Sequence, residues 1–332
     1  MKNIAVIGAG GWGTALAIHL GKLSYRVKLW VYERDLAERM SRSRENDLYL
    51  PGFTIPESVI PNNSFPETIE EAEVLISAVP SHVCRSVYQQ MLPYLSKDLV
   101  FVSVTKGIEE GTLMRMSQVI RSVIGERFEP RIAVLSGPTF AREVASETPT
   151  AVAIASEEPS IARMIQQGFS SPYFRFYTNS DVIGVELAGA VKNIIAIASG
   201  IVAGLGYGHN TIAALITRGL AEMMRLSRAL GGKPDTLAGL AGIGDLVLTC
   251  TGALSRNRRV GERLGKGEKL ASITKGMQMV AEGVHTCRAV VQLGERLGVE
   301  LPITAQVYAV LYQDKNPRQA LTELMQRELK EE

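Results

Sequence analysis

One lysine stands where a charged side chain is costly. Lys192 lies in the nearly uncharged run Ile183 to Val202, IGVELAGAVKNIIAIASGIV, whose only other charge is Glu186. Desolvating an ammonium there costs several kcal/mol unless a partner or a function requires it. Burial also lowers the pKa of a lysine toward neutrality, which suits a general acid or base. The alternative is a structural lysine whose ammonium reaches water from a buried helix.

A second segment offers a partner for this lysine. In GIGDLVLTCTG, the residues Asp245 and Thr249 are four apart and share one face if the segment is helical. Asp245 can then hold Lys192 by charge or by a hydrogen bond. The other interpretation is that Asp245, which follows a glycine, only caps the start of a helix.

The SRNRR segment predicts a site for a phosphate or a carboxylate. Ser255 is a natural N-cap, which places Arg256 and Asn257 in the first turn of a helix. Free backbone N–H groups, a guanidinium and an amide at a helix start bind anions well. A cation there opposes the helix dipole, and an anionic ligand removes that conflict. A solvated basic turn is the alternative.

A glycine motif at the N-terminus predicts dinucleotide binding. Gly8, Gly10 and Gly13 form GxGxxG between a strand pattern, Lys2 to Ile7, and a helix pattern, Thr14 to Leu23. In this context the three glycines permit a tight turn, close approach to a pyrophosphate and close packing of helix on strand. The helix start presents N–H groups to the phosphates. A purely structural glycine turn is the alternative.

Opposing signals follow the second strand, Val27 to Val31. Glu33 can accept a hydrogen bond from the 2′-OH of NAD, whereas Arg34 can hold the 2′-phosphate of NADP with Tyr32 beside the adenine. Because both signals are present, the sequence leaves the choice between NAD and NADP open.

Strand and helix patterns alternate from Met1 to about Tyr177, which predicts an α/β, Rossmann-like, doubly wound sheet of parallel strands with helices on both faces. Ligands of such sheets bind beyond the carboxyl ends of the strands, so Lys106 and Thr139 should face the crevice of the glycine loop. The remaining predicted strands are Val74 to Val79, Val100 to Val104 and Ile132 to Leu135, with Ala151 to Ala155 and Phe174 to Tyr177 at the edge.

From about Ser180 helical periodicity takes over, which predicts an all-α C-terminal domain. The expected domains are residues 1–179, which bind the dinucleotide, and residues 180–332, which carry the substrate and catalytic groups. Asp181 is the expected N-cap of the long apolar helix. The other predicted helices are Thr211 to Leu230, Arg256 to Leu264, Met277 to Leu297 and Ile303 to Tyr312.

Composition narrows the class of protein. A net charge of +2 predicts no general attraction to nucleic acid or to an anionic membrane. Cys84, Cys250 and Cys287 form no CxxC or Cys/His cluster, which favours free thiols in a reducing compartment, no metal site and a cytoplasmic protein. Glu186 and Lys192 argue against a transmembrane segment in the apolar run.

Together these features predict the reduction of a small phosphorylated ketone. A dinucleotide supplies hydride, Lys192 protonates the carbonyl oxygen, and the SRNRR turn binds the phosphate, which orients the substrate. Two rival interpretations are a hydroxy-acid dehydrogenase of the 6-phosphogluconate or hydroxyisobutyrate type and a non-catalytic NAD(P) sensor that binds a partner protein.

The motifs GAGGWGTALA, LPG, AVPSH, TKG, SGPTFA, GAVKNIIAIASG, TRGLAEM, AGIGDLVLTCT and SRNRR stand in one order along nearly the whole chain. In that order and spacing the chain resembles the bacterial-type NAD(P)-dependent glycerol-3-phosphate dehydrogenases. SRNRR and GDLVLTCT distinguish it from the related hydroxy-acid enzymes. The family usually has serine where Gly11 stands, and often arginine or histidine where Tyr32 stands.

The resemblance implies reversible interconversion of dihydroxyacetone phosphate and sn-glycerol 3-phosphate, a role in glycerophospholipid precursor synthesis and a homodimer. It implies that Lys192 is the proton donor or acceptor. The substrate-binding residues it implies are Lys106, Gly137, Thr139, Lys192, Asn193, Asp245, Thr249, Ser255, Arg256 and Asn257. The cofactor contacts are the motif glycines Gly8, Gly10 and Gly13 together with Gly11, Trp12, Tyr32, Arg34, Tyr49, Lys106, Ala141, Arg256, Val280 and Glu282.

Overall fold

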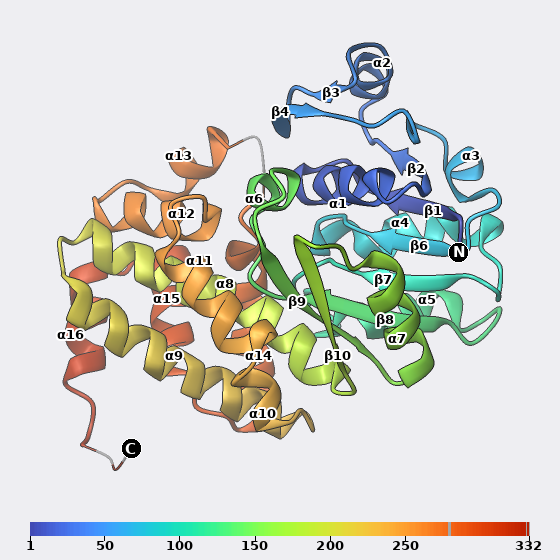
Figure 1. Cartoon of the computed structure of the whole chain (residues 1–332). Helices are drawn as coiled ribbons and strands as arrows, with labels where there is room; N and C mark the ends of the chain where they lie inside the picture. Colours follow the sequence, from blue (N-terminus) through green and yellow to red (C-terminus); the bar gives the residue numbers. More distant parts are fainter. Residues whose placement is uncertain (278–279, 330, 332) are drawn as a thin grey trace. The chain divides into compact units, whose positions relative to one another are not determined.

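The computed structural model describes residues 1–277, 280–329 and 331, and its contacts divide the chain into two compact units (Figure 1). The first unit comprises Met1–Lys106 and Met114–Glu186, and the second comprises Gly107–Leu113 and Leu187–Glu332. The domain boundary after residue 179 stays a prediction.

An eight-stranded sheet forms the centre of the first unit, in the order β10-β9-β8-β7-β6-β1-β2-β5. The predicted strands are all present, and the two predicted at an edge lie there. The strands are β1 (Asn3–Ile7), β2 (Arg26–Trp30), β5 (Val59–Asn62), β6 (Val74–Ser77), β7 (Val100–Ser103), β8 (Arg131–Ser136), β9 (Thr150–Ser156) and β10 (Phe174–Asn179).

The prediction of uniformly parallel strands is wrong at one edge of this sheet. β9 pairs antiparallel with β8, whereas β10 pairs parallel with β9. The connection from β8 to β9 holds only the short helix α6 (Ala141–Ala145), so the chain turns back along the edge instead of crossing a face of the sheet. The connection from β9 to β10 carries α7 (Pro159–Phe169), which is long enough for a parallel crossover.

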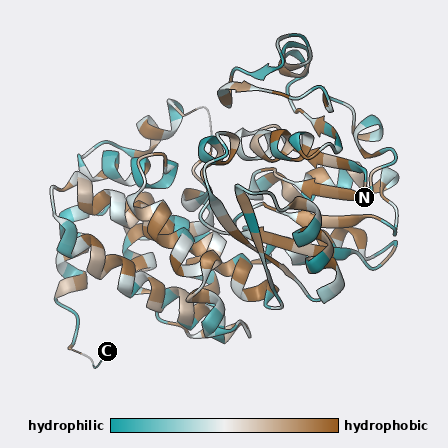
Figure 2. Ribbon diagram, in the orientation of Figure 1, coloured by the Kyte–Doolittle hydropathy of each residue, from teal (hydrophilic) through white to brown (hydrophobic). Residues whose placement is uncertain are grey.

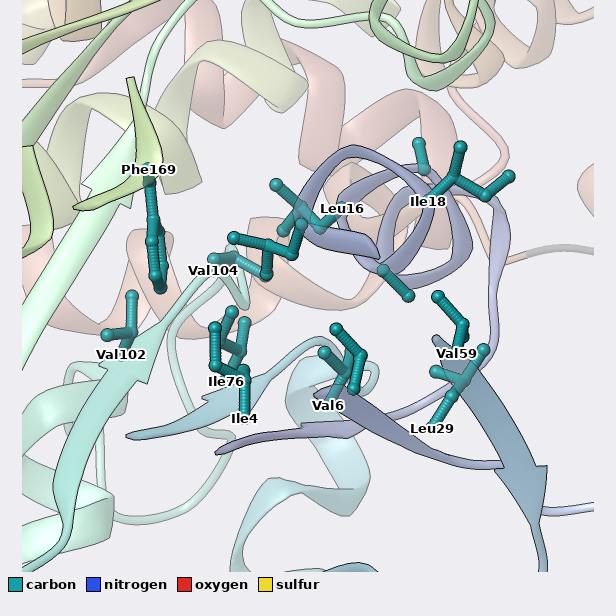
Figure 3. Close-up of a cluster of buried hydrophobic side chains, with 14 of the residues drawn as sticks. Ile4, Val6, Leu16, Ile18, Leu29, Val59, Ile76, Val102, Val104 and Phe169 are labelled. Carbon is teal, nitrogen blue, oxygen red and sulfur yellow. The ribbon is translucent and has the colours of Figure 1, made fainter. Parts of the chain in front are cut away.

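Helices cover both faces of the sheet, as the doubly wound pattern predicts. On one face Val102 of β7 belongs to a buried cluster with Leu16 and Phe169 (Figure 3). On the other face the ring of Phe101 lies 6.3 Å from that of Tyr88. The strands are therefore apolar on both sides, and they are mostly brown in Figure 2. The other helices of this unit are α1 (Gly11–Lys22), α2 (Arg34–Ser43), α3 (Phe65–Ile69), α4 (Cys84–Met91) and α5 (Met116–Ile124), with 3₁₀ turns η1 (Ser81–Val83) and η2 (Leu92–Tyr94).

Three strands were not predicted from the sequence. β5 forms the outer edge of the sheet next to β2, and an antiparallel hairpin of β3 (Glu45–Asn46) and β4 (Leu50–Thr54) lies beside α2 (Figure 1). Two of them contain proline: Pro61 lies in β5 and Pro51 in β4. Proline lacks the backbone N–H that a central strand donates, so a proline in the sequence argues against a strand. Edge strands tolerate proline, and these strands were therefore missed.

Regular structure in the described part of the second unit is entirely helical. The long helix α8 (Val182–Gly204) starts where predicted, because Asp181 Oδ1 accepts a hydrogen bond from the Gly184 N–H at 2.8 Å. The remaining helices are α9 (His209–Ala229), α10 (Pro234–Leu237), α11 (Asp245–Thr251), α12 (Arg256–Gly265), α13 (Leu270–Lys275), α14 (Glu282–Leu297), α15 (Pro302–Tyr312) and α16 (Pro317–Met325), with a π-helical turn η3 (Leu240–Gly244).

The predicted helix from Met277 to Leu297 begins later than expected. α14 starts at Glu282, and the separate helix α13 ends at Lys275, just before Gly276. Residues 278–279 lie outside the described part of the chain. Glycine at position 276 and the extended backbone of Ala281 (φ −94°, ψ 95°) separate the two helices.

Small residues bring α8 and α12 into backbone contact. A Cβ on Gly200 would lie 1.9 Å from the Arg258 carbonyl oxygen, and one on Gly261 would lie 1.9 Å from the Ile197 carbonyl oxygen. Glycine is therefore required at both positions. This contact fixes the α8 segment that carries Lys192 against the helix that begins at Arg256.

Among the described residues, α8 alone qualifies as a membrane span by length and hydropathy, but 89% of its qualifying window is buried inside the protein. The helices Pro234–Thr251 and Arg256–Gly265 pass the same test only as a pair bent by 47°. A buried core helix satisfies such a test as readily as a span does, and the burial of α8 fits a core helix.

Candidate active site

Lys192 is held by α11. Its Nζ donates hydrogen bonds to Asp245 Oδ1 and, at 2.9 Å, to Thr249 Oγ1. Lys192 and Asp245 are 5% and 1% exposed, so the lysine does not extend its ammonium into water. The Thr249 hydroxyl in turn donates to the Asp245 carbonyl oxygen at 2.6 Å. The structure therefore confirms the predicted pairing of Lys192 with Asp245 and adds Thr249 as a second partner of the lysine.

Asp245 is the first residue of α11 and not its N-cap, which is Gly244. The preceding π-helical turn η3 runs directly into α11, and a Cβ on Gly242 would lie 2.0 Å from the Leu237 carbonyl oxygen. Such turns are rare and often occur at functional sites. Here the turn places a buried carboxylate opposite α8.

The Cys250 thiol, near Lys192 and Asp245, is unreactive. Burial raises the pKa of Cys250 to about 12, and the charge of Asp245 adds to the effect while that of Lys192 opposes it. A protonated, buried thiol is a poor nucleophile. Lys192 is therefore the proton-transfer candidate of this cluster.

The start of α12 forms a second cluster on the same unit. Ser255 caps the helix by accepting a hydrogen bond from the Arg258 N–H at 3.2 Å. Asn257 donates to Asn193 Oδ1 at 2.9 Å and accepts from the Gly283 N–H at 2.9 Å. This one amide ties the first turns of α12 and α14 to the residue next to Lys192.

Arg256 supplies a cation at the same turn. Its side chain reaches solvent, but nearby protein atoms partly desolvate the guanidinium and lower its pKa. The charge of Glu282 opposes that shift. An arginine remains cationic at neutral pH despite such a shift. Glu282 begins α14, and Val280 lies two residues earlier, partly exposed. That Arg256, Val280 and Glu282 contact a cofactor stays a prediction.

The glycine turn of the first unit has the geometry that a dinucleotide needs. Gly8 has φ +108°, and a Cβ there would lie 2.8 Å from the Ala78 carbonyl oxygen. A Cβ on Gly13 would lie 1.9 Å from the Gly8 carbonyl oxygen, whereas nothing lies within 4 Å of the Cβ position of Gly10. The turn is therefore closely packed at Gly8 and Gly13 and open at Gly10, where a pyrophosphate would approach.

Several cofactor candidates surround this turn. A Cβ on Gly11 would lie 2.9 Å from the Tyr49 carbonyl oxygen and 3.7 Å from the Ala141 side chain. Among the described residues, none accepts a hydrogen bond from the buried indole N–H of Trp12. A buried orphan donor calls for an acceptor, and a bound ligand can provide one.

The later strand ends carry the other first-unit candidates. Lys106 follows β7, and Gly137, with φ +156°, follows β8. Thr139 donates to the Gly137 carbonyl oxygen at 3.2 Å. These residues belong to the first unit and Lys192 to the second. That they bind one substrate stays a prediction.

Asn46 is a candidate that sequence reasoning missed. It is fully buried, and its Nδ2 donates to the Ala9 carbonyl oxygen and to Thr14 Oγ1, both at 2.8 Å. It therefore holds the glycine turn in place. Its position in the polar run Glu45-Asn46-Asp47 is typical of a solvated turn, so the sequence carries no signal for this role.

Comparison with known proteins places both halves of the chain in one family. Residues 3–162 match the family model described as NAD-dependent glycerol-3-phosphate dehydrogenase N-terminus, and residues 181–322 match the model for the C-terminus.

Individual relatives match over the full length. The chain is 56% identical to a glycerol-3-phosphate dehydrogenase [NAD(P)+] of Koribacter versatilis, with 98% of each chain covered. It is 55% identical to the protein of that name from Syntrophotalea carbinolica, with 99% of each covered. The crystal structure of a glycerol-3-phosphate dehydrogenase from Coxiella burnetii is 40% identical and superposes with a TM-score of 0.95, covering 98% of this chain and 99% of that one.

Proposed function

The chain belongs to the NAD-dependent glycerol-3-phosphate dehydrogenase family, and from that membership we propose how its own residues carry out the reaction. It interconverts dihydroxyacetone phosphate and sn-glycerol 3-phosphate with NAD(H) or NADP(H). The observation that carries the proposed mechanism is the buried cluster of Lys192, Asp245 and Thr249.

Lys192 is the proton donor when the ketone is reduced and the acceptor in reverse. The hydrogen bonds from Nζ to Asp245 and Thr249 fix the direction of the ammonium, and the carboxylate favours its charged form. As negative charge develops on the substrate carbonyl oxygen, an ammonium in a buried site stabilises it and transfers a proton to it.

The first turn of α12 binds the substrate phosphate. Arg256 supplies a guanidinium, and the helix start supplies N–H groups and the positive end of its dipole. Asn257 and Asn193 hold this turn next to Lys192. Lys106, Gly137 and Thr139, which follow strands of the first unit, are further substrate-binding residues in this proposal.

Residues 1–179 are the dinucleotide-binding domain, and residues 180–332 are the substrate and catalytic domain. A bound dinucleotide supplies the hydride. The open position at Gly10, the tight packing behind Gly8 and Gly13, and the orphan Trp12 N–H support this assignment.

The family and the cysteines support an inference about the cell compartment, the oligomeric state and the pathway of the protein. We infer a cytoplasmic homodimer that makes the glycerol phosphate backbone of phospholipids. Cys84, Cys250 and Cys287 are buried and are not joined in disulfides, which fits a reducing compartment. A lone monomer in sedimentation equilibrium would overturn the dimer.

The experiment that tests the function is a nicotinamide absorbance assay on the purified protein. Dihydroxyacetone phosphate should be reduced rapidly, and unphosphorylated dihydroxyacetone far more slowly, because it lacks the group that the α12 turn binds. A protein that binds a dinucleotide but turns over neither ketone would instead be the non-catalytic sensor.

A further inference from the structure

The residues that follow β2 border the glycine turn. β2 lies parallel to β1, with Trp30 in register with Ile7, and the Gly8 N–H donates to the Trp30 carbonyl oxygen at 3.1 Å. The chain that leaves β2 therefore runs beside the turn that binds the pyrophosphate. In folds of this kind the adenosine ribose lies against these residues.

A carboxylate at this position is held in place. Tyr49, from the β3–β4 hairpin, donates its hydroxyl to Glu33 Oε1 at 2.7 Å. Burial, the hydrogen bond to Glu33 and the charge of Glu33 together raise the pKa of Tyr49 to about 12. The phenol therefore stays protonated at neutral pH and remains a donor to the carboxylate.

The hairpin that carries Tyr49 is itself fixed to the glycine turn. The Tyr49 N–H donates to Asn46 Oδ1 at 3.0 Å, and Asn46 Nδ2 donates to the Ala9 carbonyl oxygen at 2.8 Å. The Tyr49 carbonyl oxygen would lie 2.9 Å from a Cβ on Gly11, so the hairpin comes this close only because residue 11 has no side chain. Polar contacts thus run without interruption from the pyrophosphate turn to Glu33.

The neighbouring cation does not offset this carboxylate. The side chain of Arg34 is 84% exposed and bonds to Glu38 Oε1 at 3.3 Å on the outer surface of α2. Asp35 and Asp47 add two further carboxylates, both bonded to Arg39. Acidic groups outnumber basic ones around the start of α2, which disfavours a second phosphate there.

We propose that Glu33, held by Tyr49, accepts the ribose 2′-OH and makes this enzyme selective for NAD(H) over NADP(H). The inference rests on the proposed dehydrogenase function and decides a choice that the sequence leaves open. An anchored carboxylate hydrogen-bonds a hydroxyl without reorganising, whereas a 2′-phosphate at the same place meets a like charge that cannot move away.

The test measures dissociation constants of NADH and NADPH by nicotinamide fluorescence on the purified enzyme, with no substrate present. The wild type should bind NADH about 10-fold more tightly than NADPH or better, as expected for a charge-assisted hydrogen bond. Glu33→Gln should abolish most of this preference, chiefly by improving NADPH binding.

Tyr49→Phe keeps the ring and removes only the hydroxyl, so it should reduce the preference about threefold or more by freeing the carboxylate. Tyr25→Phe is the matched control, because Tyr25 donates its hydroxyl to the Gly168 carbonyl oxygen. It should leave the ratio of the two constants unchanged. Circular dichroism checks that every variant is folded.

Wild-type constants that are equal for the two dinucleotides, or that favour NADPH, would overturn the selectivity while leaving the dehydrogenase function intact. An unchanged ratio in Glu33→Gln would remove Glu33 from the account. Failure to bind either dinucleotide would end both the selectivity and the proposed function.

Discussion

Asn257 of α12 donates a hydrogen bond to Asn193 of α8, with 2.9 Å between Nδ2 and Oδ1. Asn193 follows Lys192 directly, and Asn257 follows Arg256. The proposed proton donor and the proposed phosphate ligand are thus each one residue from a buried amide pair. Their relative positions are fixed by this contact within the second unit.

Arg256→Ala should raise KM for dihydroxyacetone phosphate by about 100-fold, because a charge-assisted contact to phosphate contributes about 1.5–3 kcal/mol. The comparison substrate is unphosphorylated dihydroxyacetone, whose slow turnover should change little. Arg259→Ala, an exposed residue in the same helix, is the control and should leave KM unchanged. Equal losses on both substrates would remove the phosphate from the role of Arg256.

Asp245→Asn should lower kcat by about 10-fold to 1,000-fold while KM changes little, because the amide no longer favours the charged form of Lys192. The pH profile of kcat should shift toward acid, since the lysine loses its proton more readily. Steady-state kinetics between about pH 6 and pH 10 would measure this shift, because a lysine whose pKa is lowered by burial titrates in about that range. An unshifted profile would show that Asp245 does not control the proton on Lys192.

Glu186→Gln should lower the free energy of unfolding of the first unit by about 3 kcal/mol, as expected when one partner of a buried ion pair is removed. Glu186 accepts hydrogen bonds from the Ser117 N–H and hydroxyl and from Arg115, and its side chain is 4% exposed. Urea unfolding measures the loss. Glu38→Gln, which removes an exposed partner of Arg34, should cost about 1 kcal/mol or less. Similar urea midpoints for the two variants would show that the buried contacts of Glu186 with Arg115 and Ser117 do not stabilise the fold.

His19 should make stability depend on pH. Burial lowers the pKa of His19 below 6.5, and its Nε2 lies 2.7 Å from the Phe169 carbonyl oxygen, to which the neutral ring donates. The folded state therefore binds the proton less readily than the unfolded state. The stabilisation is present above the ordinary value of 6.5 and is lost as the pH falls through the lower folded value.

Thermal unfolding of His19→Asn should accordingly show a shallower decline of stability between about pH 7.5 and pH 5.5 than the wild type. His209→Asn, at the exposed start of α9, is the matched control. Parallel pH curves for the wild type and His19→Asn would rule out this contribution.

Local patterns in the sequence predicted much of the fold and of the site. The GxGxxG turn and the Ser255 N-cap depend on residues a few positions apart, and both are confirmed in the structure. Lys192 stood out because a lone charge in an apolar run is costly wherever the run lies. Its pairing with Asp245, 53 residues away, was one of two interpretations that the sequence left open, and the structure confirms it.

Features that depend on distant or backbone partners were not predictable. Nothing near Asn46 indicates that it binds the Ala9 carbonyl oxygen, 37 residues away. Nothing near Glu222 indicates that it accepts hydrogen bonds from the Ile303 and Thr304 N–H groups at the start of α15. The reversal at β9 depends on the length of one connection, which alternation of strands and helices does not encode.

The most direct test of the account is the turnover of Lys192→Ala. We predict a loss in kcat of about 100-fold to 10,000-fold, as for removal of a general acid. The variant should bind NADH with unchanged affinity, and Lys266→Ala, at an exposed lysine, should keep full activity. A kcat for Lys192→Ala within about threefold of the wild type would contradict the account, because no general acid would then be missing.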